Sequence, residues 1–399
     1  MKHFVQVLSV DILAKLALGA VSIALIRFMP VGEYAALTLA ISGAGLAAQV
    51  ISAGVNRIYI VGFERHGLAG KVEILLALQL AGVAAVALVA LPFSGAFRGL
   101  YPVAVALAGA MVISEFSKTH YQRELRFVRY SAIEFGRTAA QGIAIAGVLL
   151  VYRENLGAAA VLWSQTGALA LAFCAALFPI LQWRRFADMS SMVVLVRNIA
   201  AGPYALLFVY FSLVAVFSQV DVVLVRWLAD DHVLASYGAA LRYYGLLSLA
   251  LGAVHAVLLP AIQQARSGKE LDSLYSQHFR LVLAFAPVVA LAAVAAGWVM
   301  PWVDHGRYPD SVTTFRVLAA SAIVSFAFSP HVNLLMKLER FGFLLLLVVI
   351  ALVVDLILML LLVPRYGAVG AAFATMSASA CINLPIYFRS GKLRRQRDD

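Results

Sequence analysis

The chain has 399 residues, of which 63% are hydrophobic and 13% are charged. A soluble domain contains about 45–50% apolar and about 25% charged residues, and polar groups must cover its surface. The composition therefore excludes a soluble globular protein and favours one that lies in a lipid bilayer. A net charge of +11 would suggest nucleic acid as a partner of a soluble protein. Here the basic residues stand between apolar segments, so membrane topology accounts for them and no nucleic acid partner is expected.

The first apolar segment follows Met1–His3 and has no small-residue cleavage site. It is interrupted by Asp11 and Lys15, which predicts a retained membrane helix rather than a cleaved signal peptide. Apolar runs of spanning length, about 20 residues each, recur along the whole chain. They are predicted at 8–29, 34–56, 72–92, 102–117, 131–152, 156–182, 200–227, 234–262, 281–302, 311–336, 341–363 and 367–389. Such long runs differ from the short alternating segments of a membrane β-barrel, so the predicted fold is all-α.

Lysine and arginine are distributed unevenly between alternate loops. One set of loops, which includes both termini, contains 21 of these residues, and the other set contains six. Cytoplasmic loops are enriched in lysine and arginine. The asymmetry therefore predicts cytoplasmic termini and an even number of spans, and the apolar runs set that number at about twelve.

Short motifs recur in the same order in the two halves of the chain. The GLYP sequence at 99–102 matches GRYP at 306–309, and IALIRFM at 23–29 matches VVLVRWL at 222–228. A duplicated unit gives a nearly constant offset of this kind. An even number of helices in each unit gives a parallel repeat, which in secondary transporters encloses a central cavity. We therefore expect two six-helix bundles around a cavity. The predicted bundles are 1–190 and 191–399.

Charged residues inside the predicted spans are the most informative part of the sequence. Because a charge at the bilayer centre costs several kcal/mol, such residues face the bundle interior or water. The cations favour an anionic substrate such as a phosphate or pyrophosphate, to which arginine donates bidentate hydrogen bonds. The predicted substrate-binding residues are Lys15, Arg137, Arg242 and Arg316. The acids could take up protons and couple transport to an ion gradient. The predicted ion-coupling residues are Asp11, Asp221 and Asp355.

Structural roles compete with these functional ones. Asp11 and Lys15 are four residues apart and could neutralise each other on one helix face. Arg137 could pair with Glu134 or extend towards the cytoplasmic surface. Glu134 and Glu115 are placed near water at cytoplasmic helix ends. His331 is a single polar residue that could line a cavity or simply be packed.

Catalytic, metal-binding and cofactor-binding motifs are not found in the sequence. The nearest approach to a nucleotide-binding loop, Gly67–Lys71, is followed by Val72 and has Arg65 at the place of the first glycine. The two cysteines lie in apolar stretches, where they are read as small packed residues. We expect a transporter without a cofactor or metal, not an enzyme.

Several loop and helix motifs resemble those of Wzx-type polysaccharide flippases of the multidrug/oligosaccharidyl-lipid/polysaccharide exporter superfamily. They are FSQVDVVLVR at 217–226, YGAALR at 237–242, QRELRF at 122–127, GRYP at 306–309 and PRYGAVGAA at 364–372. The resemblance extends over nearly the full length. It implies a flippase for an undecaprenyl-pyrophosphate-linked oligosaccharide in a bacterial inner membrane, working with membrane lipids and with polysaccharide polymerase and chain-length machinery. It also implies that a cationic cavity binds the pyrophosphate, a role that Lys15, Arg242 and Arg316 fit.

Three alternatives remain open at the level of sequence. A drug or metabolite exporter of the same superfamily would have an acidic cavity, whereas the charged residues predicted here to lie in the interior of the spans are four cations and three acids. A membrane enzyme of surface polysaccharide assembly would need a large external loop, and the predicted outer loops are short. A lipid II-type flippase of the same superfamily would have additional helices.

Overall fold

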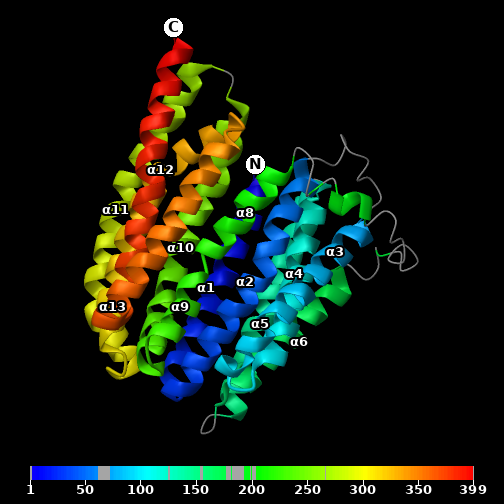
Figure 1. Ribbon diagram of the computed structural model, residues 1–399, viewed down its shortest axis with the longest axis vertical. Helices are drawn as coiled ribbons and strands as arrows, with labels where there is room; N and C mark the ends of the chain where they lie inside the picture. Colours follow the sequence, from blue (N-terminus) through cyan, green and yellow to red (C-terminus); the bar gives the residue numbers. More distant parts are fainter. Residues whose placement is uncertain are drawn as a thin grey trace. The chain divides into compact units, whose positions relative to one another are not determined.

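The computed structural model is formed by α-helices in the part of the chain that it describes (Figure 1). It describes residues 2–61, 72–124, 126–152, 156–176, 204–265 and 267–398, together with 181, 193–197 and 199. No strand occurs in these ranges, which confirms the all-helical prediction. Helices are the expected outcome for such apolar segments, because a helix satisfies its backbone hydrogen bonds within itself and needs no partner in lipid.

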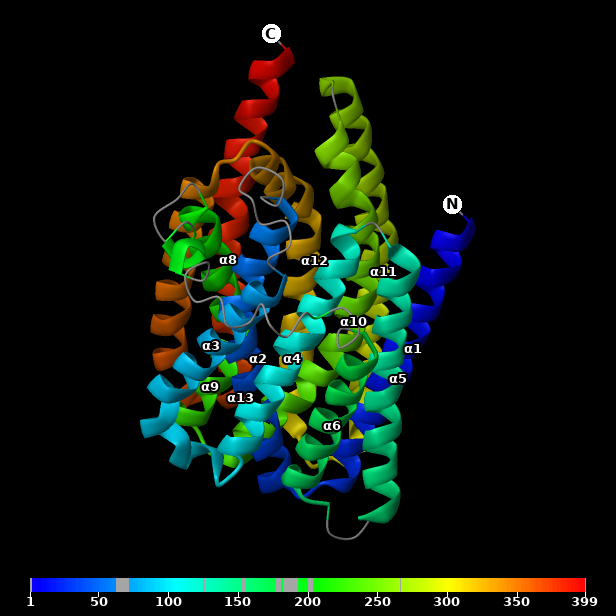
Figure 2. The same ribbon diagram turned by 90° about the vertical axis from the view of Figure 1, so that its right-hand side faces the viewer.

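The chain forms two compact units, Met1–Arg226 and Trp227–Asp399, each with most of its contacts inside itself. The helices of the first unit are α1 (Lys2–Phe28), α2 (Val31–Val61), α3 (Val72–Ala90), the 3-10 helix η1 (Leu91–Phe97), α4 (Tyr101–Arg123), α5 (Phe127–Val151), α6 (Ala158–Ala176), α8 (Ala205–Phe217) and most of α9 (Val220–Leu228). In this unit α2 packs against α3, α4, α6 and α8, and α5 packs against α1 and α6. Figure 2 shows α4, α5 and α6 side by side.

Helix α8 is fastened to α2 by close contacts. The Ser212 hydroxyl donates a hydrogen bond of 2.6 Å to the carbonyl of Val50. One turn further along α2, a Cβ at Gly54 would overlap with the ring of Phe208 and lie 3.1 Å from its Cα. The sequence repeat assigns residues 205–217 to the second half of the chain. Packing places them in the first unit, because α2 has no side chain at position 54 and lets the α8 backbone approach.

Replacing Gly54 with alanine is therefore expected to destabilise the protein by about 1–3 kcal/mol, the usual cost of overpacking a tight contact. The measurement is thermal unfolding of the purified protein in detergent. Gly147→Ala in α5 is the matched control, because a Cβ at Gly147 meets nothing within 4 Å. Equal melting temperatures for the two variants would contradict the close approach of α2 and α8.

The second unit contains the remaining helices. They are α10 (Asp231–Gln264), α11 (Gly268–Asp304), α12 (Pro309–Lys337) and α13 (Phe341–Asp398). Helix α12 packs against the other three. Helix α13 consists of two helical runs that meet at Gly367, whose φ of 55° and ψ of −134° are not helical. A Cβ at Gly370 would overlap with the carbonyl oxygen of Leu362, so the chain folds back sharply at this point. The predicted spans 341–363 and 367–389 are separated at this break.

Six described helices are long and apolar enough to cross a membrane, and a seventh span results if the pair α8 and α9, bent by 43°, is counted as one. The six are Val31–Ile60, Val72–Phe97, Val128–Val151, Gly268–Asp304, Pro309–Lys337 and Phe341–Gly391. The last of them contains the break at Gly367. The protein is therefore a multi-pass membrane protein, and a count of about twelve spans stays a prediction.

Candidate functional site

Three cations from three helices surround one buried carboxylate in the first unit. Glu134 in α5 is 2% exposed. Its Oε1 lies 3.3 Å from Lys15 Nζ of α1 and 2.6 Å from the guanidinium of Arg137, and its Oε2 lies 3.3 Å from Lys118 Nζ of α4. These contacts link α1, α4 and α5, and removal of either charge from such a pair leaves the other buried and uncompensated.

A second carboxylate, Glu115, completes this group, which we call the Glu134 cluster. Its Oε1 lies 2.8 Å from Lys118 Nζ and 3.9 Å from the Arg137 guanidinium. The Glu115 side chain is 41% exposed. The side chains of Lys15, Lys118 and Arg137 are 29%, 14% and 19% exposed. The cluster is thus closed at Glu134 and open at Glu115, and an anion that approaches from the open side meets partly exposed cations.

The structure brings two of the predicted substrate-binding residues together and adds partners that sequence reasoning missed. Lys15 and Arg137 were both predicted, and Arg137 does pair with Glu134. Lys118 lies directly after the predicted span 102–117, and both glutamates were predicted at helix ends near water. A signal was present in the spacing, because Glu115 and Lys118 in α4 are three residues apart, as are Glu134 and Arg137 in α5, so each pair shares a helix face.

The predicted acids lie on different elements. Asp221 in α9 is 6% exposed, and its Oδ1 accepts a 2.8 Å hydrogen bond from the amide of Val222. Asp355 in α13 is 1% exposed. The side chain of Asp11 lies outside the described residues. Asp221 and Asp355 are therefore kept from solvent, and they belong to separate units.

The two predicted arginines of the second unit have different surroundings. Arg242 in α10 is half-buried, and among the described side chains it has no ion pair or hydrogen-bond partner. Arg316 in α12 is exposed and donates from Nε to the carbonyl of Ala293 in α11 at 2.9 Å. It crosses α11 at Gly297, where a Cβ would lie 2.9 Å from its guanidinium. Arg316 is thus held by a backbone carbonyl, whereas the described side chains offer no acceptor to the guanidinium of Arg242.

A further arginine, Arg57, was assigned to the loop after the second span. Helix α2 continues to Val61, so Arg57 is part of the helix and is half-buried. Its guanidinium carbon lies 5.7 Å from the ring centre of Phe211 in α8, a cation–π arrangement. Within the described ranges it has no ion pair. The sequence does not show that α2 extends beyond residue 56, and for this reason Arg57 was not predicted as a helix residue.

His331 is packed rather than open to a cavity. Its Nδ1 lies 2.6 Å from the hydroxyl oxygen of Ser390. The rings of Tyr275 and Tyr387 stand edge-on to it, with centroids at 4.8 and 5.1 Å. No group of three or more metal-binding side chains is present in the part of the chain that the structure describes.

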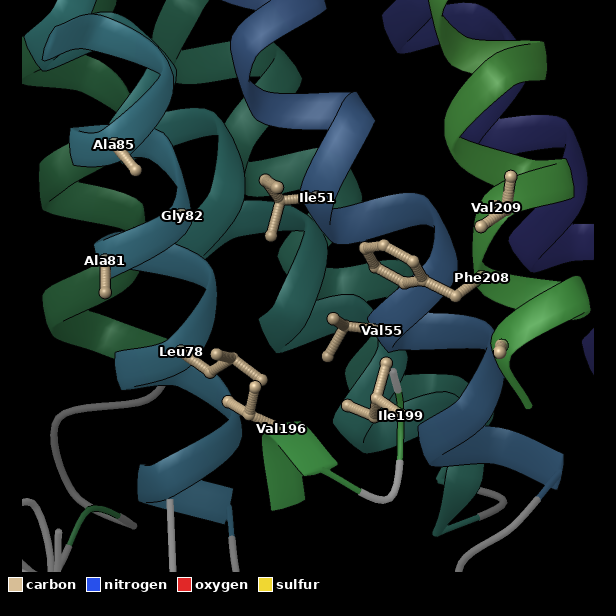
Figure 3. Close-up of a pocket in the computed structure, with 11 residues that line it drawn as sticks. Ile51, Val55, Leu78, Ala81, Gly82, Ala85, Val196, Ile199, Phe208 and Val209 are labelled. Atoms are coloured by element: carbon tan, nitrogen blue, oxygen red, sulfur yellow. The ribbon is translucent and has the colours of Figure 1, made fainter. Parts of the chain in front are cut away.

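An apolar pocket of about 500 Å³ lies between α2, α3 and α8 in the first unit (Figure 3). The ring of Phe208 projects into it from α8 (Figure 3). Its other lining residues are Ile51, Val55, Leu78, Ala81, Gly82, Ala85, Val196, Ile199, Ala205 and Val209. None of these side chains carries a charge or a hydrogen-bonding group, and none belongs to the Glu134 cluster.

Comparison with known proteins identifies the fold. No family model matches the chain, and no protein of curated function matches it. Among solved structures, the lipid II flippase MurJ in an inward closed conformation matches with a TM-score of 0.69 and 13% identity, over 96% of this chain and 87% of MurJ. A multidrug resistance MATE family transporter of the MOP superfamily, in its inward-facing conformation, matches with a TM-score of 0.66 and 14% identity, over 96% of each chain.

A third solved structure extends the comparison. The Vibrio cholerae MATE transporter VcmN matches with a TM-score of 0.63 and 14% identity, over 99% of this chain and 97% of that one. At such low identity the likeness concerns the backbone and not the cargo. It covers nearly the full length of each protein, in chains from two kinds of transporter. The chain is an all-helical membrane protein with the fold that MATE transporters of the MOP superfamily share with the flippase MurJ.

Proposed function

We propose that the protein is a flippase that moves an oligosaccharide linked to undecaprenyl pyrophosphate across the bacterial inner membrane. The observation that carries this proposal is the Glu134 cluster, in which Lys15, Lys118 and Arg137 converge from α1, α4 and α5 and stay partly exposed. Cations are seldom kept in spanning segments without a role. A pyrophosphate offers the oxygens that arginine and lysine bind best.

The fold supports the same proposal, because the structurally similar MurJ is a flippase for lipid II. We further propose about twelve spans, cytoplasmic termini, and two repeated bundles, 1–190 and 191–399, that alternate access to a central cavity. The boundary at 190 concerns the sequence duplication, whereas packing divides the chain at Arg226. Lys15, Arg137, Arg242 and Arg316 are the proposed substrate contacts. Polysaccharide polymerase and chain-length proteins are the proposed partners.

Reconstitution in liposomes tests the proposal directly. A prenyl-pyrophosphate-linked oligosaccharide with a fluorescent sugar is placed in both leaflets, and a membrane-impermeant quencher reports its movement. We expect flipping that depends on the protein and on an ion gradient, which supplies about 2.3 kcal/mol per charge per 100 mV. Movement at the rate of empty liposomes, together with normal surface polysaccharide in a deletion strain, would refute a flippase role.

Export of a cationic drug or metabolite is the second candidate. Two observations favour it: MATE transporters are among the similar structures, and Asp221 and Asp355 are carboxylates buried in helices. The same liposomes distinguish the two candidates when they are loaded with a cationic dye. Gradient-driven movement of the dye without movement of the glycolipid would favour the exporter.

Asp355→Asn is expected to abolish the proton-dependent part of transport. Asparagine keeps the shape of the side chain but cannot exchange a proton, so a carrier that couples through Asp355 loses its response to a pH gradient. The measurement is the transport rate with and without an imposed pH gradient. Asp310→Asn, an exposed acid in the first turn of α12, is the matched control. An unchanged gradient response in Asp355→Asn would exclude coupling at this position.

A further inference from the structure

The two carboxylates of the Glu134 cluster are not equivalent. Glu134 is 2% exposed, contacts three cations and lies at the junction of α1, α4 and α5. Glu115 is 41% exposed, and its ion pairs among the described residues are with Lys118 and Arg137. Glu134 is therefore a fixed counter-ion, whereas Glu115 can rotate into solvent without any movement of a helix.

Glu115 occupies the position that an anionic ligand would take. Its Oε1 lies 2.8 Å from Lys118 and 3.9 Å from Arg137, on the exposed side of the cluster. A phosphoryl oxygen carries the same kind of charge and accepts the same hydrogen bonds. An anion that enters from the open side and binds Lys118 and Arg137 at the place of the Glu115 carboxylate must displace it, because two anions at one place repel each other.

We propose that Glu115 is an internal competitor of the anionic headgroup, a specificity-determining residue that occupies the cationic site when no cargo is bound. The inference rests on the proposed function, since it assumes a pyrophosphate cargo at this cluster. In the empty carrier, Glu115 keeps Lys118 and Arg137 neutralised. On binding, the headgroup displaces it, and its return to the two cations helps to release the cargo.

The competition predicts the direction in which ligand affinity changes when Glu115 is replaced, and a residue that only positions the site predicts the opposite direction. Removal of a competitor tightens ligand binding, whereas loss of a positioning residue weakens it. An exposed ion pair is weak enough for a ligand to displace, so we expect Glu115→Gln to increase affinity about threefold to fivefold. Glu115→Asp, whose shorter side chain reaches Lys118 less well, is expected to give a smaller increase and serves if the glutamine variant does not fold.

The experiment uses the full-length protein in nanodiscs of uncharged lipid. Binding of inorganic pyrophosphate and of farnesyl pyrophosphate is measured by titration calorimetry for the wild type and each variant. Glu124→Gln is the matched control, because Glu124 directly follows α4, is 33% exposed and pairs with His120 and Arg126 instead of the cluster. Both glutamine variants change the net charge equally. We expect tighter binding in Glu115→Gln for both probes and unchanged binding in Glu124→Gln.

Weaker or unchanged affinity in Glu115→Gln would overturn the competitor and leave the flippase proposal standing. An equal increase in Glu124→Gln would also overturn it, because the effect would then reflect net charge alone. Failure of every protein to bind either probe would instead refute the pyrophosphate cargo. Equal affinity for inorganic and farnesyl pyrophosphate would contradict a lipid-linked cargo. The change of affinity in Glu115→Gln would still test whether Glu115 competes with the anion.

Discussion

Glu134→Gln is expected to destabilise the protein by about 3–5 kcal/mol, because it removes the shared partner of three clustered cations. Lys15, Lys118 and Arg137 all lie within 4 Å of the Glu134 carboxylate. Glutamine has nearly the same shape but no charge, so it cannot offset the cost of keeping these cations away from water. Thermal unfolding in detergent, followed by tryptophan fluorescence, measures the loss.

A second substitution shows whether the loss comes from uncompensated charge. The double variant Glu134→Gln with Lys118→Met removes one of the cations left behind, and lysine and methionine have similar length. We expect it to regain part of the lost stability. Glu115→Gln is the comparison for a carboxylate at the exposed edge of the cluster, and it should cost at most about 1 kcal/mol. If Glu134→Gln were as stable as Glu115→Gln, the cluster would not hold α1, α4 and α5 together.

Arg242→Ala is expected to lower glycan flipping about 10-fold to 100-fold, while the amount of protein in the membrane stays the same. Charge-assisted hydrogen bonds to a ligand contribute about 1.5–3 kcal/mol each, and each 1.4 kcal/mol is a factor of about ten. Arg242 has no ion pair or hydrogen-bond partner among the described residues, so its removal breaks no described contact of this kind. The liposome assay measures the rate, and an immunoblot of the membranes measures the amount.

Two further substitutions separate the role of Arg242 from a general effect of charge. Arg242→Lys keeps the charge but loses the planar fork, and we expect an intermediate rate. Lys269→Ala removes an exposed cation in the first turn of α11 and should leave flipping unchanged. Normal flipping in Arg242→Ala would remove Arg242 from the site, and the substrate contacts would then be sought at the Glu134 cluster and at Arg57.

The sequence by itself determined that the protein lies in a lipid bilayer and that its secondary structure is helical. In a bilayer every backbone group is satisfied inside its own helix, so local hydropathy suffices to locate helices. The sequence also predicted a break in α13, between the spans 341–363 and 367–389, where Pro364 and Gly367 interrupt an apolar run. The structure shows a positive φ at Gly367. The intramembrane cations were identified in the same way, because charge is conspicuous against apolar neighbours.

Only the tertiary structure decided which partner each charge has. Lys15 contacts Glu134, which is 119 positions away in the sequence, because α1 packs against α5. Arg316 donates a hydrogen bond to the carbonyl of Ala293. A sequence pattern cannot predict such a bond, because every residue has a backbone carbonyl. Helix α8 packs against α2 at Gly54, although the repeat assigns it to the other half of the chain. Hydropathy depends on each residue and its neighbours along the chain, whereas pairing depends on which helix faces meet.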